Sequence, residues 1–322
     1  MYFGSVRFFK NLILCVVCIL ILIPTVLAFR FHGEAKALAE ASVPVADDAQ
    51  SHGSPDSLFE PEGAVAEPEE APPEEAEASA EAEPELFSAD PPAYQELYPD
   101  FYAPEPYHAT TRQQQTVYLT FDDGPSERTD EILNVLAEKG VKATFFVIGQ
   151  GEEANLERMR RIVAEGHTIG MHSYTHDYNS VYSSVEGFLD EFYRIFCQIK
   201  EATGVTPSVF RCPGGSINGY NGGFYQEILS EMIRRGFVPY DWNVSSEDAA
   251  TNQTLPVETL VRNVVDNTVG KVRSIVLFHD SGSKTTSSQA IGPVIDRLRE
   301  QGYTFEPITP DTMPVLYNYT HI

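Results

Sequence analysis

Apolar and polar residues alternate in short blocks after residue 115. Apolar runs over Val117–Phe121 and Ala143–Ile148 predict two strands. Between them, apolar residues recur at helical spacing from Thr129 to Lys139, and Gly140 follows as a helix stop. The same pattern predicts further strands at Thr168–Met171, Val209–Arg211, Val238–Trp242, Ser274–Phe278 and Thr304–Pro307. It predicts further helices at Glu153–Glu165, Ser184–Ala202, Gly223–Arg235, Pro256–Val269 and Ser288–Gln301.

This order of elements predicts an α/β fold. Strands that alternate with helices favour parallel βαβ units. In such folds the active site gathers at the C-terminal ends of the strands. Polar clusters in this chain stand directly after the apolar strand runs, so we expect the chemistry to lie there.

The first residues carry a long apolar run from Leu12 to Leu27, preceded by Arg7 and Lys10. A membrane-spanning helix needs roughly 17–25 residues, so the run is near the lower limit. Basic residues before it favour an orientation with the rest of the chain outside the cytoplasm. We therefore expect a single-pass signal-anchor over residues 1–30. Val26–Ala28 resembles a signal-peptidase site, so a cleaved and secreted form stays an alternative.

An acidic stretch follows the apolar run. Between Glu34 and Pro106 there are 20 acidic residues and one basic residue, Lys36, which together give 19 of the 25 net negative charges. So little apolar surface cannot offset the entropy of folding. We predict a disordered linker over 31–110 and a folded domain over 111–322. The linker acts either as a tether or as a solubilising spacer.

Charge and cysteine content exclude some classes of protein. The net charge of −25 offers no basic face for phosphates, so a nucleic-acid partner is not expected. Four cysteines do not make a disulfide scaffold, since Cys15 and Cys18 lie inside the apolar run. We expect Cys197 and Cys212 to be free.

Carboxylates and histidines stand at the ends of several predicted strands. Asp122 and Asp123 are adjacent, and like charges this close repel unless a cation or an arginine compensates. His172 and His176 are four residues apart, which allows both imidazoles to reach one ion. Each pair also has an alternative without function. The two aspartates could belong to a surface turn, and the spacing of the two histidines could be coincidental.

Two later clusters supply further candidates. Arg211 precedes Cys-Pro-Gly-Gly, so it could orient a carboxylate while glycine N–H groups serve an oxyanion. His279 ends an apolar strand and is placed to act as a general acid. The segment Asp241–Asp248 supplies carboxylates that could keep this imidazole protonated. A surface arginine in a turn and a structural histidine are the alternatives.

In chain order these clusters resemble the motifs of the polysaccharide deacetylases (carbohydrate esterase family 4, the NodB-homology domain). The family motifs read TFDDGP, H-S/T-x-x-H, R-x-P-G/Y, a Trp-containing D-x-x-D segment and L-x-H. The resemblance covers Gln115–Ile308, about 60% of the chain, and essentially none of the first 110 residues.

The resemblance implies an irregular (β/α) barrel of about seven parallel strands, and it implies a role for each matching residue. Asp122 would be the general base, Arg211 its orienting residue, His279 the general acid and Asp248 the partner of His279. The remaining matches are the metal ligands Asp123, His172 and His176, the oxyanion residue Gly214, and the groove residues Leu277 and Trp242.

The implied reaction is metal-dependent removal of N-acetyl groups from a glycan polymer outside the cell, with peptidoglycan expected first. Zn²⁺ is the expected ion, and Co²⁺, Ni²⁺ or Mn²⁺ are alternatives. Chitin oligosaccharides and O-acetyl-xylan are alternative substrates, and an inactive carbohydrate-binding protein is the alternative outside the enzyme class. The sequence departs from the family at Ala249, where Trp is usual, and at Gly214, where Tyr is usual. The missing Trp changes that wall of the groove, and the missing Tyr predicts a more open cleft with a different substrate fit.

Overall fold

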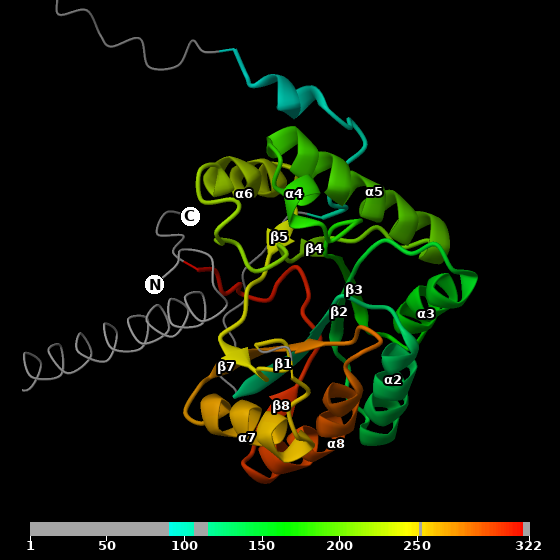
Figure 1. The fold of residues 1–322 in the computed structure, drawn as a ribbon, viewed down its shortest axis with the longest axis vertical. Coiled ribbons are helices and arrows are strands. Elements are labelled where there is room, and N and C mark those ends of the chain that lie inside the picture. The colour runs from blue at the N-terminus through cyan, green and yellow to red at the C-terminus, as the bar shows by residue number, and fades with distance from the viewer. Residues whose placement is uncertain (1–89, 106–114, 251–252, 318–322) are drawn as a thin grey trace, which may run out of the picture. The chain divides into compact units, whose positions relative to one another are not determined.

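A sheet of parallel strands forms the centre of the described chain, which comprises residues 90–105, 115–250 and 253–317 of a computed structural model (Figure 1). The strands run in the order β5-β4-β3-β2-β1-β7-β6, and β8 pairs with the start of β1. Their bounds are β1 Thr116–Asp122, β2 Thr144–Val147, β3 Thr168–Met171, β4 Val209–Phe210, β5 Val238–Pro239, β6 Val244–Ser245, β7 Arg273–His279 and β8 Thr304–Phe305. The predicted parallel α/β fold is confirmed. Among the described strands the barrel stays open, because β5 and β6 end the sheet without pairing with each other.

Helices surround the curled sheet (Figure 1). They are η1 Ala93–Glu96, α2 Glu127–Lys139, α3 Glu153–Ala164, α4 Tyr178–Val181, α5 Val185–Thr203, α6 Tyr225–Arg234, α7 Val257–Thr268 and α8 Thr285–Glu300. All six predicted helices are present to within three residues at each end. The short elements η1, α4 and β6 were not predicted, because two to four residues are too few to show a period.

Alternation along the central strands directs side chains to two different faces. In β1, Val117 and Phe121 belong to the large core that includes the helices, whereas Tyr118 belongs to a second, smaller apolar cluster. Side chains two residues apart share a face, so Asp122 lies on the same face as Tyr118. The parallel register places Asp122 opposite His279 of β7. The fold thus brings two candidate catalytic residues from distant parts of the chain to one edge.

Residues 90–105 lie within the range predicted to be a disordered linker, but they are folded onto α5 and α6. Phe101 is fully buried and contacts Phe196 and Phe237 ring to ring. The buried Arg235 guanidinium donates to four backbone carbonyls of this segment, those of Tyr94, Leu97, Tyr98 and Phe101. The folded unit therefore begins before residue 111. Aromatic residues supply the apolar surface that this segment buries. The sequence analysis missed it because acidic residues dominate the composition of the wider stretch.

Two predictions on the N-terminal part, the signal-anchor over 1–30 and the linker over 31–89, fall on residues outside the described ranges. Within those ranges, every helix is too short or too polar to span a bilayer. Cys197 and Cys212 are both free, as predicted.

Candidate active site

Three side chains at the ends of β1 and β3 form a group able to hold a metal ion. One ligand atom each from Asp123, His172 and His176 lies within 4.8 Å of the others. Asp123 Oδ1 is 3.1 Å from His176 Nε2 and 3.5 Å from His172 Nε2. This oxygen is buried without a hydrogen-bond partner in the described structure. A buried, unpaired carboxylate oxygen facing two imidazoles fits a divalent cation, for which this donor set is suited.

The backbone carbonyl of Arg211 orients one of these imidazoles. His172 Nδ1 lies 2.8 Å from that oxygen. Because a carbonyl can only accept, Nδ1 carries the proton and Nε2 is left to face Asp123. Burial alone would lower the pKa of His172, but the charges of Asp122 and Asp123 outweigh it and raise that pKa. Burial and the neighbouring His172 lower the pKa of His176. Protons and a cation therefore compete for His172.

The pKa of Asp123 also reflects this environment. Burial would raise the pKa of Asp123, yet the facing His172 imidazole, with contributions from the charges of His279 and His176, holds it well below its ordinary value. The carboxylate is therefore ionised across the physiological range, as a ligand must be.

Asp122 is held by a fully buried arginine. Arg211 Nη1 donates to Asp122 Oδ1 at 2.8 Å and to Thr120 Oγ1 at 2.7 Å. The other guanidinium donors reach the carbonyls of Tyr240 and Asp241. The arginine is thus fixed by four acceptors and neutralises the charge of Asp122. The second oxygen, Asp122 Oδ2, lies 3.8 Å from His172 Nε2.

The opposite wall of the cleft carries a histidine paired with a carboxylate. His279 Nδ1 lies 2.7 Å from Asp248 Oδ1, and the His279 N–H donates to Asp248 Oδ2 at 2.9 Å. Burial would lower the pKa of His279, but this hydrogen bond and charge raise it to about 9. Ser287 also donates to Asp248. Another carboxylate of the segment Asp241–Asp248, that of Asp241, instead accepts from Ser216 and has no part in this pair.

These two walls enclose a cavity of about 400 Å³. Its lining includes every predicted site residue except Arg211, which lies beneath the floor and contacts Asp122. The lining residues among the predictions are Asp122, Asp123, His172, His176, Gly214, Trp242, Asp248, Leu277 and His279. The structure therefore brings all ten predicted residues to one place.

Tyr178, which the sequence analysis missed, lines the same cavity beside Gly214. A Cβ atom at Gly214 would lie 2.8 Å from the Tyr178 hydroxyl and 3.1 Å from its ring, and Gly214 has a φ of +75°. The positive φ therefore strains any L side chain at 214, and such a side chain would also have to displace the end of the Tyr178 ring. The expectation of a more open cleft at this point is wrong, because the ring of Tyr178 occupies the space. Ala249, at the other departure, is exposed on the cavity wall.

Glu191 of α5 supports the histidine loop and was also missed. This buried carboxylate accepts hydrogen bonds from the backbone N–H groups of Tyr174 and Thr175 and from the Thr175 and Ser180 hydroxyls. The loop needs such support because His176 has a φ of +56°, a strained value for a non-glycine residue. A carboxylate on the apolar face of a predicted helix was the signal available in the sequence.

Asp280 is buried, and its backbone N–H donates to the carbonyl of Asp122. Thr129 donates to Oδ2 of Asp280, while Oδ1 has no partner among the described residues. Burial, with the charges of Asp123 and Asp122, raises its pKa to about 7 against the opposing effect of Thr129. A Cβ atom at Gly124 would lie 2.2 Å from this carboxylate, so the Asp-Asp-Gly turn requires glycine there.

A family model described as polysaccharide deacetylase matches residues 109–227. A peptidoglycan-N-acetylglucosamine deacetylase of Bacillus cereus is 34% identical over 61% of this chain and 70% of its own length. A bifunctional xylanase/deacetylase of Pseudobutyrivibrio xylanivorans is 31% identical over 62% of this chain and 31% of its own length. The match to the second relative therefore spans less than half of that protein.

A solved structure agrees with these sequence relatives. The catalytic domain of a peptidoglycan N-acetylglucosamine deacetylase from Eubacterium rectale superposes with a TM-score of 0.63 at 33% identity. The superposition covers 66% of this chain and 97% of that domain.

Proposed function

This chain belongs to the polysaccharide deacetylase family, and from that premise we propose that it is a metal-dependent hydrolase that removes N-acetyl groups from an extracytoplasmic glycan, with peptidoglycan the leading substrate. One observation carries the proposal. A single cavity holds an arginine-bound carboxylate beside an Asp-His-His group on one wall and a carboxylate-bound histidine on the other.

Asp123, His172 and His176 would hold the ion. A divalent cation, Zn²⁺ being our proposal, lowers the pKa of a bound water and polarises an acetyl carbonyl when it is present. Asp122 acts as the general base. Because Arg211 occupies its Oδ1, the other oxygen is left to accept a proton from water.

The attack of water forms a C–O bond at the acetyl carbonyl, and collapse breaks the amide C–N bond. The backbone N–H of Gly214 is proposed to stabilise the oxyanion, and Leu277 to contact the acetyl methyl. His279 gives its proton to the departing nitrogen. Asp248 makes this possible because it keeps the imidazole charged at neutral pH. The products are acetate and a free amine.

Peptidoglycan is preferred because several relatives, from Bacillus cereus and Listeria monocytogenes among others, are named as peptidoglycan deacetylases. Acetylxylan remains a second candidate, since the relative from Pseudobutyrivibrio is named a xylanase/deacetylase. A chitin oligosaccharide is the third. An inactive carbohydrate-binding protein is disfavoured, because base, acid and all three ligand residues share one cavity.

The test is acetate release by the purified full chain from peptidoglycan, chitin oligomers and acetylxylan in parallel, before and after chelation and with each metal restored. We expect release from peptidoglycan that chelation abolishes and Zn²⁺ restores. Release that persists after verified removal of the metal would refute metal dependence. No release from any of the three by the metal-loaded protein would refute the deacetylase proposal.

We also propose a location for the chain. The apolar run Leu12–Leu27 and the acidic stretch after it support an anchor in the cell membrane with the catalytic domain outside. Membrane fractionation and protease treatment of intact cells would test this. Catalytic domain that stays inside protease-resistant cells would contradict it, and a chain that begins near Phe29 in the medium would indicate cleavage.

A further inference from the structure

A second cavity of about 360 Å³ adjoins the catalytic one. The two share Trp242, Ser245 and Glu247 in their linings, so the two cavities lie side by side. Small-molecule sites have volumes of about 300–1,000 Å³, a range that includes this one. None of the proposed catalytic groups reaches it, because base, acid and metal ligands line only the first cavity.

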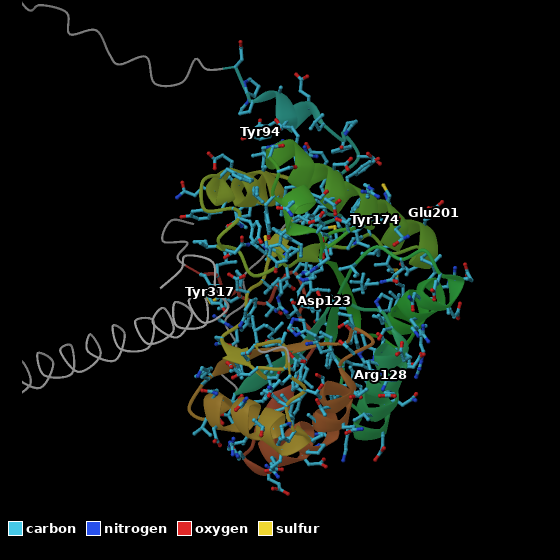
Figure 2. All side chains as sticks on the ribbon, viewed as in Figure 1. Tyr94, Asp123, Arg128, Tyr174, Glu201 and Tyr317 are labelled. Atoms are coloured by element: carbon cyan, nitrogen blue, oxygen red, sulfur yellow. The ribbon has the colours of Figure 1, made fainter. Side chains whose placement is uncertain are left out.

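Two aromatic side chains build the second cavity. The rings of Trp242 and Tyr317 contact edge to face, with centroids 5.3 Å apart. Figure 2 labels Tyr317 in the C-terminal segment, well apart from Asp123. Tyr317 is the last residue that the structure describes, and it lies outside the region of the family motifs, Gln115–Ile308. Its position therefore depends on contacts made by the end of the chain.

Those contacts are numerous and specific. The Tyr317 N–H donates to Asp241 Oδ2 at 2.8 Å, and its hydroxyl donates to the Trp242 carbonyl at 2.9 Å. The Asp241 N–H donates to the Val315 carbonyl at 2.8 Å. Gly215 lacks a side chain where the Tyr317 ring passes, since a Cβ atom there would lie 3.4 Å from it. The buried carboxylate of Asp241 thus positions the ring rather than taking part in the proton transfers.

The polar residues of this cavity suit hydroxyl groups. Asn267 and Glu247 are exposed on its lining and supply an amide and a carboxylate. Glu247 has a φ of +67°, and its N–H donates to Ser245 Oγ. Strained backbone of this kind persists where the surroundings fix it, and it occurs often at ligand sites.

We infer that this second cavity, called here the Trp242–Tyr317 subsite, binds the sugar residue next to the one being deacetylated. A pyranose ring has an apolar C–H face and a rim of hydroxyl groups. Aromatic side chains match the face, while Asn267 and Glu247 match the rim. The inference rests on the proposed function, because its occupant is the neighbour of the acetylated sugar. It makes Tyr317 a determinant of substrate length.

The single tryptophan of the chain provides a direct test. Trp242 fluorescence reports on this subsite whether or not the protein turns over. We would titrate the full-length Asp122→Asn variant, which lacks the base, with N-acetylglucosamine and with its β-1,4-linked tetrasaccharide. Only the tetrasaccharide can fill both cavities at once. We expect it to bind at least about tenfold more tightly than the monosaccharide, and to change the fluorescence more.

The same titration on Tyr317 variants tests whether the preference for the tetrasaccharide over the monosaccharide arises in the Trp242–Tyr317 subsite. Tyr317→Ala in the Asp122→Asn background should reduce the preference for the tetrasaccharide about tenfold, the scale of a lost aromatic contact and its buried area. Tyr317→Phe retains the ring and should keep most of the preference. If Tyr317→Ala lowers the melting temperature strongly, Asn267→Ala and Glu247→Ala change exposed side chains of the same cavity and should lower the preference two- to threefold, about the value of one hydrogen bond.

A preference that survives all of these variants, or a tetrasaccharide that binds no better than the monosaccharide, would overturn the subsite. Acetate release by the wild-type chain is measured separately on the same sugars. Length-dependent fluorescence without acetate release from these sugars or from peptidoglycan and acetylxylan would keep the subsite and refute the deacetylase. Acetate release without length dependence would refute the subsite alone.

Discussion

Each wall of the cleft carries a histidine whose Nδ1 atom has a different hydrogen-bond partner. The wall with Asp123, His172 and His176 is called the metal wall, and the wall with His279 and Asp248 is called the acid wall. On one wall, a backbone carbonyl binds His172 Nδ1, so that Nε2 faces Asp123 and His176. On the other wall, the Asp248 carboxylate binds His279 Nδ1 and raises the pKa of that imidazole to about 9. A neutral acceptor fixes a tautomer, whereas a charged acceptor also stabilises the imidazolium. The partner of Nδ1 is therefore one difference between the proposed metal ligand and the proposed general acid.

The supports behind the two walls differ as well. The metal wall rests on a strained loop that a buried Glu191 holds through several hydrogen bonds. On the acid wall, His279 ends the regular strand β7 and Ser287 of α8 donates to Asp248, although Asp248 itself follows the strained Glu247 in a loop. We therefore expect substitutions some distance from the metal wall to weaken metal binding. The catalytic effect of the acid wall should depend mainly on His279 and Asp248 themselves.

The largest expected effect is loss of the metal wall. Asp123→Asn removes the charged ligand, and we expect at least about 100-fold weaker Zn²⁺ binding together with loss of activity. Equilibrium dialysis measures the first and acetate release the second. Asp177→Asn is a matched control at the residue directly after His176 and keeps the helix cap of α4. Wild-type metal affinity in the Asp123→Asn variant would show that this group is not the metal site.

A smaller loss is expected when only the acid wall changes. Asp248→Asn should lower kcat by about 10²–10³-fold, since general acid catalysis is worth about 10²–10⁴-fold, and leave metal content unaltered. The His279 acid form is lost as pH rises through about 9 in the native chain. The variant should move this alkaline limb toward the ordinary histidine pKa of 6.5.

The same pair affects stability with a defined sign. A raised pKa in the folded state stabilises fully below pH 6.5, and this contribution is lost as pH rises through about 9. Chemical unfolding across that range should show the loss in the wild type and a flatter curve in Asp248→Asn. An alkaline limb that stays in place in the variant would contradict the role given to Asp248.

An intermediate test addresses the support of the metal wall. Glu191→Gln keeps the size of the side chain but weakens its acceptors, so Zn²⁺ affinity should fall about 10–100-fold while the alkaline limb stays where it is. Glu201→Gln, an exposed change near the end of the same helix, is the control. Equal metal affinity in both variants would mean that the loop holds its conformation without Glu191.

The smallest expected effect concerns the Tyr178 ring. Tyr178→Phe keeps the ring in the space above Gly214 and should change KM less than about threefold, the value of one ordinary hydrogen bond. Tyr178→Ala opens this wall, and KM should rise about tenfold with the larger part of kcat retained. Steady-state kinetics of both variants on the same glycan distinguishes the contribution of the hydroxyl from that of the ring. A larger loss in Tyr178→Phe than in Tyr178→Ala would give the hydroxyl, not the ring, the main role.

The sequence by itself determined the six longer helices and most strands, and its resemblance to the family motifs identified the ten candidate site residues that the fold brings together. These features are local: a period of two or 3.6 residues marks an element, and the motifs stand directly after strands. Asp122 and His279 could be predicted separately, because each follows its own apolar run. Their pairing across β1 and β7 follows from the parallel sheet.

Only the tertiary structure decided what surrounds these residues. Tyr178 fills the space at Gly214, Glu191 holds the histidine loop, and residues 90–105 fold onto α5 and α6. Tyr317 reaches Asp241 across 76 residues of sequence. Such contacts have no period and no fixed spacing, because they depend on which surfaces the folded chain brings together. A local pattern therefore identifies the chemistry, and long-range packing gives the cleft its shape.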